Sequence, residues 1–178
     1  MAASHRGDVD QAIALFEAAA QAEPSSAIPH YLLGVEFAQA GRMGEAEASL
    51  ARAVLLDPGL DMARFQLGLL QFTERRVAVA MMTWKPLSEL PTTAALQRFV
   101  IGFAALARDD FEEAKARLLE GIAANTENAP LNTDMRMVLT QIDALQAGGG
   151  AAADSDDDSP DGDAHILLAN YRQQGRPN

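Results

Sequence analysis

The sequence has no cysteine and only three histidines. Without cysteine the chain can form no disulfide bond, no thiol nucleophile and no Cys-ligated zinc site. His5, His30 and His165 are far apart in the sequence, so their spacing does not predict a metal-binding cluster. The sequence therefore disfavours thiol and metal enzymes, and we expect no cofactor.

Basic residues are also scarce. Fourteen Lys and Arg stand against 25 Asp and Glu, which gives a formal net charge of −11. This balance argues against a basic surface for phosphate groups, so nucleic acid is not an expected partner. There is no uninterrupted apolar run of membrane-spanning length, and residues 1–10 do not resemble a signal peptide. We expect no direct membrane insertion and a cytoplasmic location. The preference for Arg over Lys, together with abundant Ala, hints at a GC-rich bacterial genome.

Several residue types recur with a period of 34. A small residue recurs at Ala12, Ala46, Ala80 and Ala114, and a large apolar residue at Phe16, Leu50, Trp84 and Leu118. The same step links Leu33-Gly34, Leu67-Gly68 and Ile101-Gly102. A glycine lets two crossing helices approach closely, so we expect the Ala of the second helix to lie opposite it. We expect the large residues to fill the space between neighbouring helix pairs.

The clearest copy of the period is residues 27–60, with Leu33-Gly34, Phe37, Gly41, Ala46, Leu50, Ala53 and Pro58. It resembles the tetratricopeptide repeat. Later copies depart from that signature, notably at Gln71 and Arg75. The resemblance implies an all-α, right-handed solenoid of antiparallel helix pairs with a concave inner groove. It implies a protein–protein interaction module and no catalytic chemistry.

The expected repeat domain is residues 1–147. It divides into a half repeat 8–26, repeats 27–60, 61–94 and 95–128, and a capping helix 133–146. Helices are expected near 9–22, 29–40, 44–56, 62–73, 77–85, 94–107 and 110–124. Side-chain caps are predicted at Asp8 and Asp109, a left-handed helix end at Gly41, and a helix stop at Lys85 because Pro86 follows.

In this family the groove is lined from the first helix of each pair, and here those positions are apolar. The predicted peptide-binding residues are Tyr31, Val35, Phe65, Leu69, Phe72, Phe99, Phe103 and Leu106. The bulky rings are expected to face a ligand, since they would crowd a tight superhelix. The alternative is that some of these side chains form the core between helices, notably Val35, Leu69 and Met62. The implied partner is an apolar helix or peptide of another protein.

Both ends of the chain carry further predictions. Residues 148–162 predict a flexible acidic linker, and residues 163–178 a short apolar docking motif built on Ile166, Leu167, Leu168, Tyr171 and Arg172. This motif is expected to occupy the groove of its own chain or of a neighbour. Alternatively it is a binding motif that another protein recognises. At the N-terminus the apolar side of Ile13, Phe16 and Ala20 is expected to lack one neighbouring helix, which would favour self-association or the docking of a segment from elsewhere.

The function predicted from these observations is a non-enzymatic adaptor or co-chaperone. It would bind an apolar helix or peptide in the concave groove and be regulated or occupied by its own C-terminal segment. Two alternatives rest on resemblance: a bacterial secretion-type tetratricopeptide chaperone that holds apolar export substrates, and a scaffold subunit of a larger envelope assembly.

Overall fold

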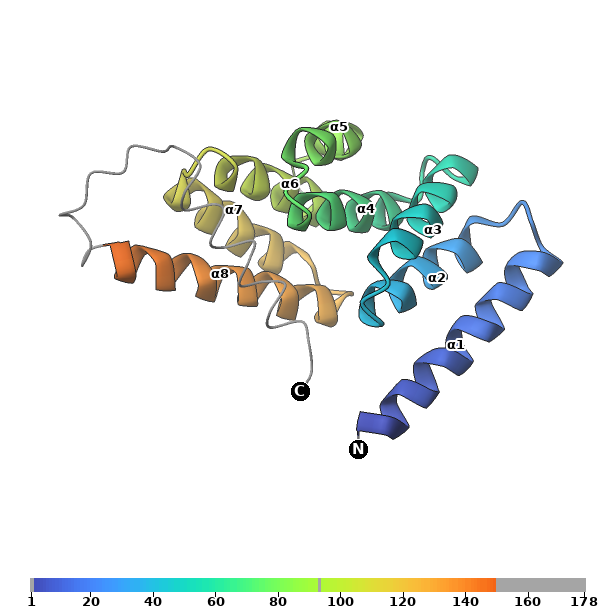
Figure 1. Cartoon of the computed structure of the whole chain (residues 1–178). Helices are drawn as coiled ribbons and strands as arrows, with labels where there is room; N and C mark the ends of the chain where they lie inside the picture. Colours follow the sequence, from blue (N-terminus) through green and yellow to red (C-terminus); the bar gives the residue numbers. More distant parts are fainter. Residues whose placement is uncertain (1, 93, 150–178) are drawn as a thin grey trace.

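The computed structural model describes residues 2–92 and 94–149, apart from the side chains of residues 2–8, 148 and 149. These ranges contain eight helices and no strand (Figure 1), which confirms the predicted all-α solenoid. The helices are α1 (Ala2–Ala22), α2 (Ala27–Gln39), α3 (Met43–Leu56), α4 (Asp61–Thr73), α5 (Val77–Ser88), α6 (Ala95–Leu106), α7 (Phe111–Ala124) and α8 (Ala129–Gly149). The predicted docking motif and most of the predicted linker lie outside the described residues.

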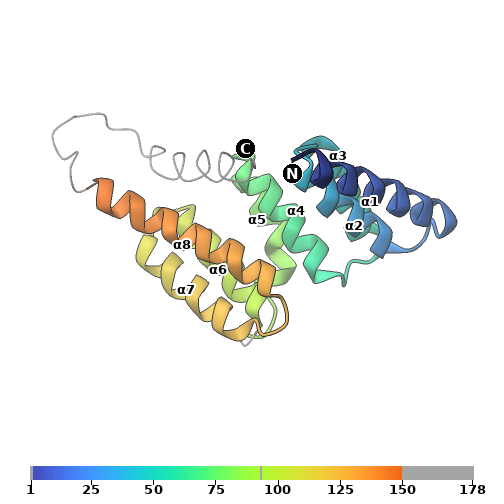
Figure 2. The ribbon, with the colours of Figure 1, turned by 90° about the horizontal axis from the view of Figure 1, so that it is seen from below.

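Consecutive helices pack together along the whole array. The most extensive contacts join α2 to α3, α4 to α5 and α6 to α7, which are the three predicted helix pairs. α1 packs on α2 at one end of the array and α8 on α7 at the other, and Figure 2 shows these two ends well separated. None of the described helices combines the length and the apolar character that a membrane span requires.

The turn inside each helix pair repeats with the same backbone geometry. The residues at Gly41, Arg75 and Asp109, spaced by 34, have φ of 76°, 64° and 57°. The following amide donates back over five residues each time: Arg42 N to Phe37 O at 2.8 Å, Arg76 N to Gln71 O at 2.9 Å, and Asp110 N to Ala105 O at 3.0 Å. This pattern is the Schellman ending of a helix. The predicted left-handed end at Gly41 is confirmed, and two non-glycine residues adopt it as well.

Helix boundaries differ from the prediction at four places. α1 begins at Ala2, so Asp8 lies within the helix instead of capping it. The N-cap of α7 is Asp110, one residue later than predicted, and its carboxylate accepts a 3.1 Å bond from Glu113 N. α5 continues past Pro86 to Ser88, because a proline in the last turn removes only one helical hydrogen bond.

The start of α8 is the fourth difference: it begins at Ala129, not residue 133, and it extends into the predicted linker as far as Gly149. Asn128 caps it, with its side-chain oxygen accepting a 3.1 Å bond from Leu131 N. Asn125 and Asn132 add two reciprocal bonds of 2.8 Å across the turn. These three asparagines fix the angle at which α8 leaves α7.

The close helix crossings lie at the glycines, but the nearest opposing residue is the large one of the second helix; the predicted alanine is among the three nearest contacts only at Gly102, through the carbonyl of Ala114. A Cβ placed on Gly34 would lie 2.5 Å from Cγ of Leu50, and one on Gly102 would lie 3.1 Å from Cγ of Leu118. At Gly68 it would overlap the indole of Trp84. The prediction was wrong because the large residue itself occupies the space that the missing side chain leaves.

The two terminal helices close the ends of the core. On α1, Ile13 is buried in the cluster of Leu33, Phe37, Ala46 and Leu70, so the predicted bare N-terminal edge is wrong for this residue. Phe16 and Ala20 pack against the same cluster and stay partly exposed. On α8, Leu131, Met135, Val138 and Ile142 are buried in the largest core cluster. The outer side of α8 carries the exposed polar residues Thr133, Arg136, Thr140, Asp143 and Gln146, as expected of a helix at the end of a solenoid.

Candidate interaction surface

Six of the eight predicted groove residues lie in the core. Phe65, Phe72, Phe99 and Phe103 are at most 2 % exposed, and Leu69 and Leu106 are at most 6 % exposed. The prediction that these six residues face a ligand is therefore wrong. They form the core between neighbouring helices, which was the alternative.

The rings avoid crowding because they pack around one tryptophan. Phe65 stacks on Trp84 with centroids 5.7 Å apart, and Phe103 lies 5.3 Å from the same indole. Phe72 meets Phe103 edge-on at 5.2 Å, and Phe99 lies 6.0 Å from Phe65. These separations are typical of favourable aromatic pairs. The aromatic cluster therefore joins α4, α5 and α6 into one core.

The other two predicted residues, Tyr31 and Val35, are partly exposed on α2. With Ile28, which is 50 % exposed, and the half-buried Ala38 they recur at intervals of three and four residues along one side of the helix. We call these four residues the α2 face. No charged residue belongs to this row, and it is the part of the predicted groove that remains accessible.

Tyr31 anchors the α2 face to the core. Its ring packs against the cluster of Ala27, Ala53 and Ala63, where α2, α3 and α4 meet. Burial raises the pKa of the Tyr31 hydroxyl, so the side chain is neutral at physiological pH. On the opposite side of α2, burial and, to a lesser degree, the charge of Arg52 lower the pKa of His30. The α2 face is thus uncharged and apolar.

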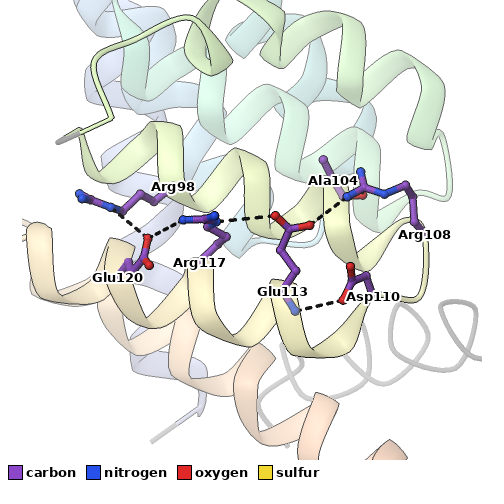
Figure 3. A network of polar contacts seen from close by, with 7 residues as sticks. All are labelled: Arg98, Ala104, Arg108, Asp110, Glu113, Arg117 and Glu120. Carbon is purple, nitrogen blue, oxygen red and sulfur yellow. Dashed lines mark hydrogen bonds and ion pairs between the residues drawn. The ribbon is translucent and has the colours of Figure 1, made fainter.

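A polar network runs along α6 and α7 (Figure 3). Arg117 bridges Glu120 at 3.1 Å and Glu113 at 3.7 Å; Arg98 also reaches Glu120, at 3.4 Å, and Arg108 reaches Glu113 at 3.2 Å. These side chains are mostly half-exposed, so the network contributes little energy per pair and mainly fixes how α7 lies on α6. At the start of α7, Asp110 thus serves as the cap and Glu113 as an ion-pair partner.

Buried polar groups also serve the packing. Gln71, where the family signature has tyrosine, accepts a 2.7 Å bond from Thr83 Oγ1 and donates a 3.3 Å bond to Glu47. Glu47 in turn pairs with Arg76 at 2.7 Å. These contacts connect α3, α4 and α5. Within residues 2–92 and 94–149 no group of three His, Asp or Glu side chains is arranged to hold a metal ion.

One exposed apolar feature escaped the sequence analysis. Val79 and Met82 on α5 are 42 % and 78 % exposed. The available signal was the composition of α5, which contains a single charged residue, Lys85. The surface lies on the second helix of its pair, whereas the predicted groove residues all lie on first helices.

Comparison with known proteins shows which folds this chain resembles. Residues 1–61 match the tetratricopeptide repeat family. A structure of MamA from Desulfovibrio magneticus RS-1 superposes with a TM-score of 0.57 at 15% identity, covering 96% of this chain and 85% of that one. The MamA RS-1 ArsTM double mutant gives a TM-score of 0.56 at 15% identity, covering 96% and 88%. No curated protein matches the sequence. Residues 1–61 are therefore similar to the tetratricopeptide repeat family, and the chain shares the helical-repeat fold of the MamA structures.

Proposed function

We propose that this protein is a non-enzymatic adaptor that holds an apolar helix or peptide of another protein on the α2 face. The fold supports the general role, since tetratricopeptide solenoids bind other proteins. The observation that carries the specific proposal is the exposure of Ile28, Tyr31 and Val35. The equivalent positions on α4 and α6 are largely buried.

The chemistry of the α2 face defines its ligand. Apolar side chains spaced three and four residues apart along a helix match the apolar stripe of a second amphipathic helix. Tyr31 offers a rigid ring with a polar tip, which is typical of anchor residues in protein interfaces. The net charge of −11 favours ligands whose polar side is basic.

A defined probe tests this proposal. A fluorescein-labelled peptide with Leu along one helical face and Lys on the other would be titrated into the full chain and followed by anisotropy. A peptide with Ser in place of Leu is the ligand control. We expect saturable binding of the Leu peptide only.

Matched variants then locate the binding surface. Ile28→Glu should weaken binding at least tenfold, because it buries a charge under the ligand. Leu55→Glu is the control, since Leu55 is 70 % exposed on α3 and outside the α2 face. Equal losses in both variants, or no binding of the Leu peptide at all, would contradict the proposal.

A further inference from the structure

The outer side of α5 is an apolar surface without a partner among the described residues. Ala78, Val79, Met82 and Pro86 are exposed and lie within one side of the helix, which we call the α5 face. Met82 is the most exposed large apolar side chain of the described chain, at 78 %. In Figure 1 α5 lies on the side of α4 and α6 that is opposite to α8.

The repeat itself shows that this surface is unusual. Thirty-four residues earlier, α3 carries Glu45, Ala48 and Arg52 at the positions of Val79, Met82 and Pro86. Thirty-four residues later, α7 carries Glu113, Ala116 and Glu120 there. Both flanking repeats thus have a small alanine at the position of Met82 and a charged residue on either side of it. Only α5 has large apolar side chains or proline at all three positions.

Pro86 lies at the C-terminal end of the α5 face. Because proline has no N–H, it cannot donate the helical bond to the carbonyl of Met82. The pyrrolidine ring of Pro86 is itself apolar and exposed, so it extends the apolar surface by one further turn of α5.

We propose that the α5 face binds the C-terminal segment of the same chain, through Leu167, Leu168 and Tyr171. These residues are spaced so that a helical turn would present them together. Residues 154–163, which precede them, are acidic and can attract the ammonium group of Lys85 at the edge of the α5 face. Among the described residues Lys85 forms no ion pair.

The length of chain after α8 allows this contact. About 17 residues separate Gly149 from Ile166, and a Gly-rich coil of that length has a root-mean-square reach of about 23 Å. Fully extended it spans roughly 56 Å, whereas α8 itself is about 32 Å long. The segment can therefore reach across the array from the end of α8.

The size of the α5 face favours a tethered segment over a second copy of the protein. A stable dimer interface buries about 800 Å² on each partner, and two large exposed side chains supply only a small part of that area. A tethered segment needs fewer contacts, because its effective concentration is in the millimolar range. The proposal is independent of the α2 face and leaves that face to another protein.

Methionine methyl groups provide the reporters for a test on the full chain. The protein lacks cysteine, so Gln173→Cys places a single nitroxide label in the C-terminal segment. We expect the methyl signal of Met82 to lose at least half its intensity relative to the reduced label. Met43 on α3 and Met137 on α8, which are 37 % and 39 % exposed, should keep theirs.

Variants distinguish docking from chance proximity. Val79→Glu and Leu168→Asp should each restore the Met82 signal, whereas Leu55→Glu and Ile28→Glu should leave the broadening unchanged. Glu in the first turn of α5 suits the helix dipole, so Val79→Glu should preserve the fold, as circular dichroism can check. Broadening centred on Met62, or uniform over all methyl groups, would overturn the proposal. So would broadening in a mixture of labelled and isotope-enriched molecules, which would show docking between copies.

Discussion

The indole of Trp84 lies directly against the backbone of Gly68, and its Nε1 donates a 2.9 Å hydrogen bond to the carbonyl of Phe65. Glycine at position 68 thus creates the space for the largest side chain of the core. Trp84 in turn supports the ring cluster that joins α4, α5 and α6.

Gly68→Ala should therefore lower the free energy of unfolding by about 2–3 kcal/mol, since a rigid, fully buried indole cannot move away from an added methyl group. Gly102→Ala is the matched control. There the nearest atoms lie 3.1–3.3 Å from the added Cβ, and the gain in helix propensity offsets the small adjustment. Urea unfolding measures both. If the two variants were equally stable, the contact between residue 68 and the Trp84 indole would not limit the side chain at this position.

A second pair of glycines tests the backbone of the turn. Gly41 has φ of 76° and Gly44 lies in the first turn of α3, and an added Cβ would meet nothing within 4 Å at either site. Gly41→Ala should destabilise the protein by about 1–2 kcal/mol through left-handed strain. Gly44→Ala should stabilise it by about 0.5–1 kcal/mol. Thermal melts of the two variants should thus shift in opposite directions, and shifts of the same sign would refute this account.

The contribution of α8 to the core can be measured by truncating two of its side chains. Ile142 is fully buried, so Ile142→Ala should cost about 2–4 kcal/mol. Met137 is 39 % exposed on the same helix, and Met137→Ala should change stability by no more than about 0.5 kcal/mol. Similar effects at both positions would mean that α8 is only loosely attached to α6 and α7.

The stability of the protein should depend on pH through Asp134 on α8. Burial raises its pKa above the ordinary value of 3.8, so the folded state favours the protonated carboxyl. Its contribution to stability is full below pH 3.8 and is lost as pH rises through the raised pKa. Asp134→Asn should therefore melt at a higher temperature than the wild type at pH 7, and the two proteins should converge near pH 3. A difference that persists unchanged in acid would exclude ionisation as its origin.

The period of 34 predicted the helices and their pairing, because it acts over the whole chain and depends on no single contact. It could not show which apolar residues stay accessible. Tyr31 and Phe65 hold the same position in successive repeats, yet only Phe65 is fully buried, since it meets Trp84 and the rings of α6. Burial at such a position depends on the neighbouring repeat, which the local sequence does not describe. Asn128 was missed for a similar reason, because its role emerges only with Asn125 and Asn132 in place.

The three Schellman turns have a consequence for how such arrays change over evolutionary time. Gly41, Arg75 and Asp109 adopt one backbone conformation with three different side chains. The shape of the turn is thus maintained by its hydrogen bonds and by the crossing of the helices, even where a side chain at this position adds left-handed strain. A repeat can lose its sequence signature while it keeps its geometry. Counting repeats in such a protein from motif residues alone will underestimate the number of helical hairpins.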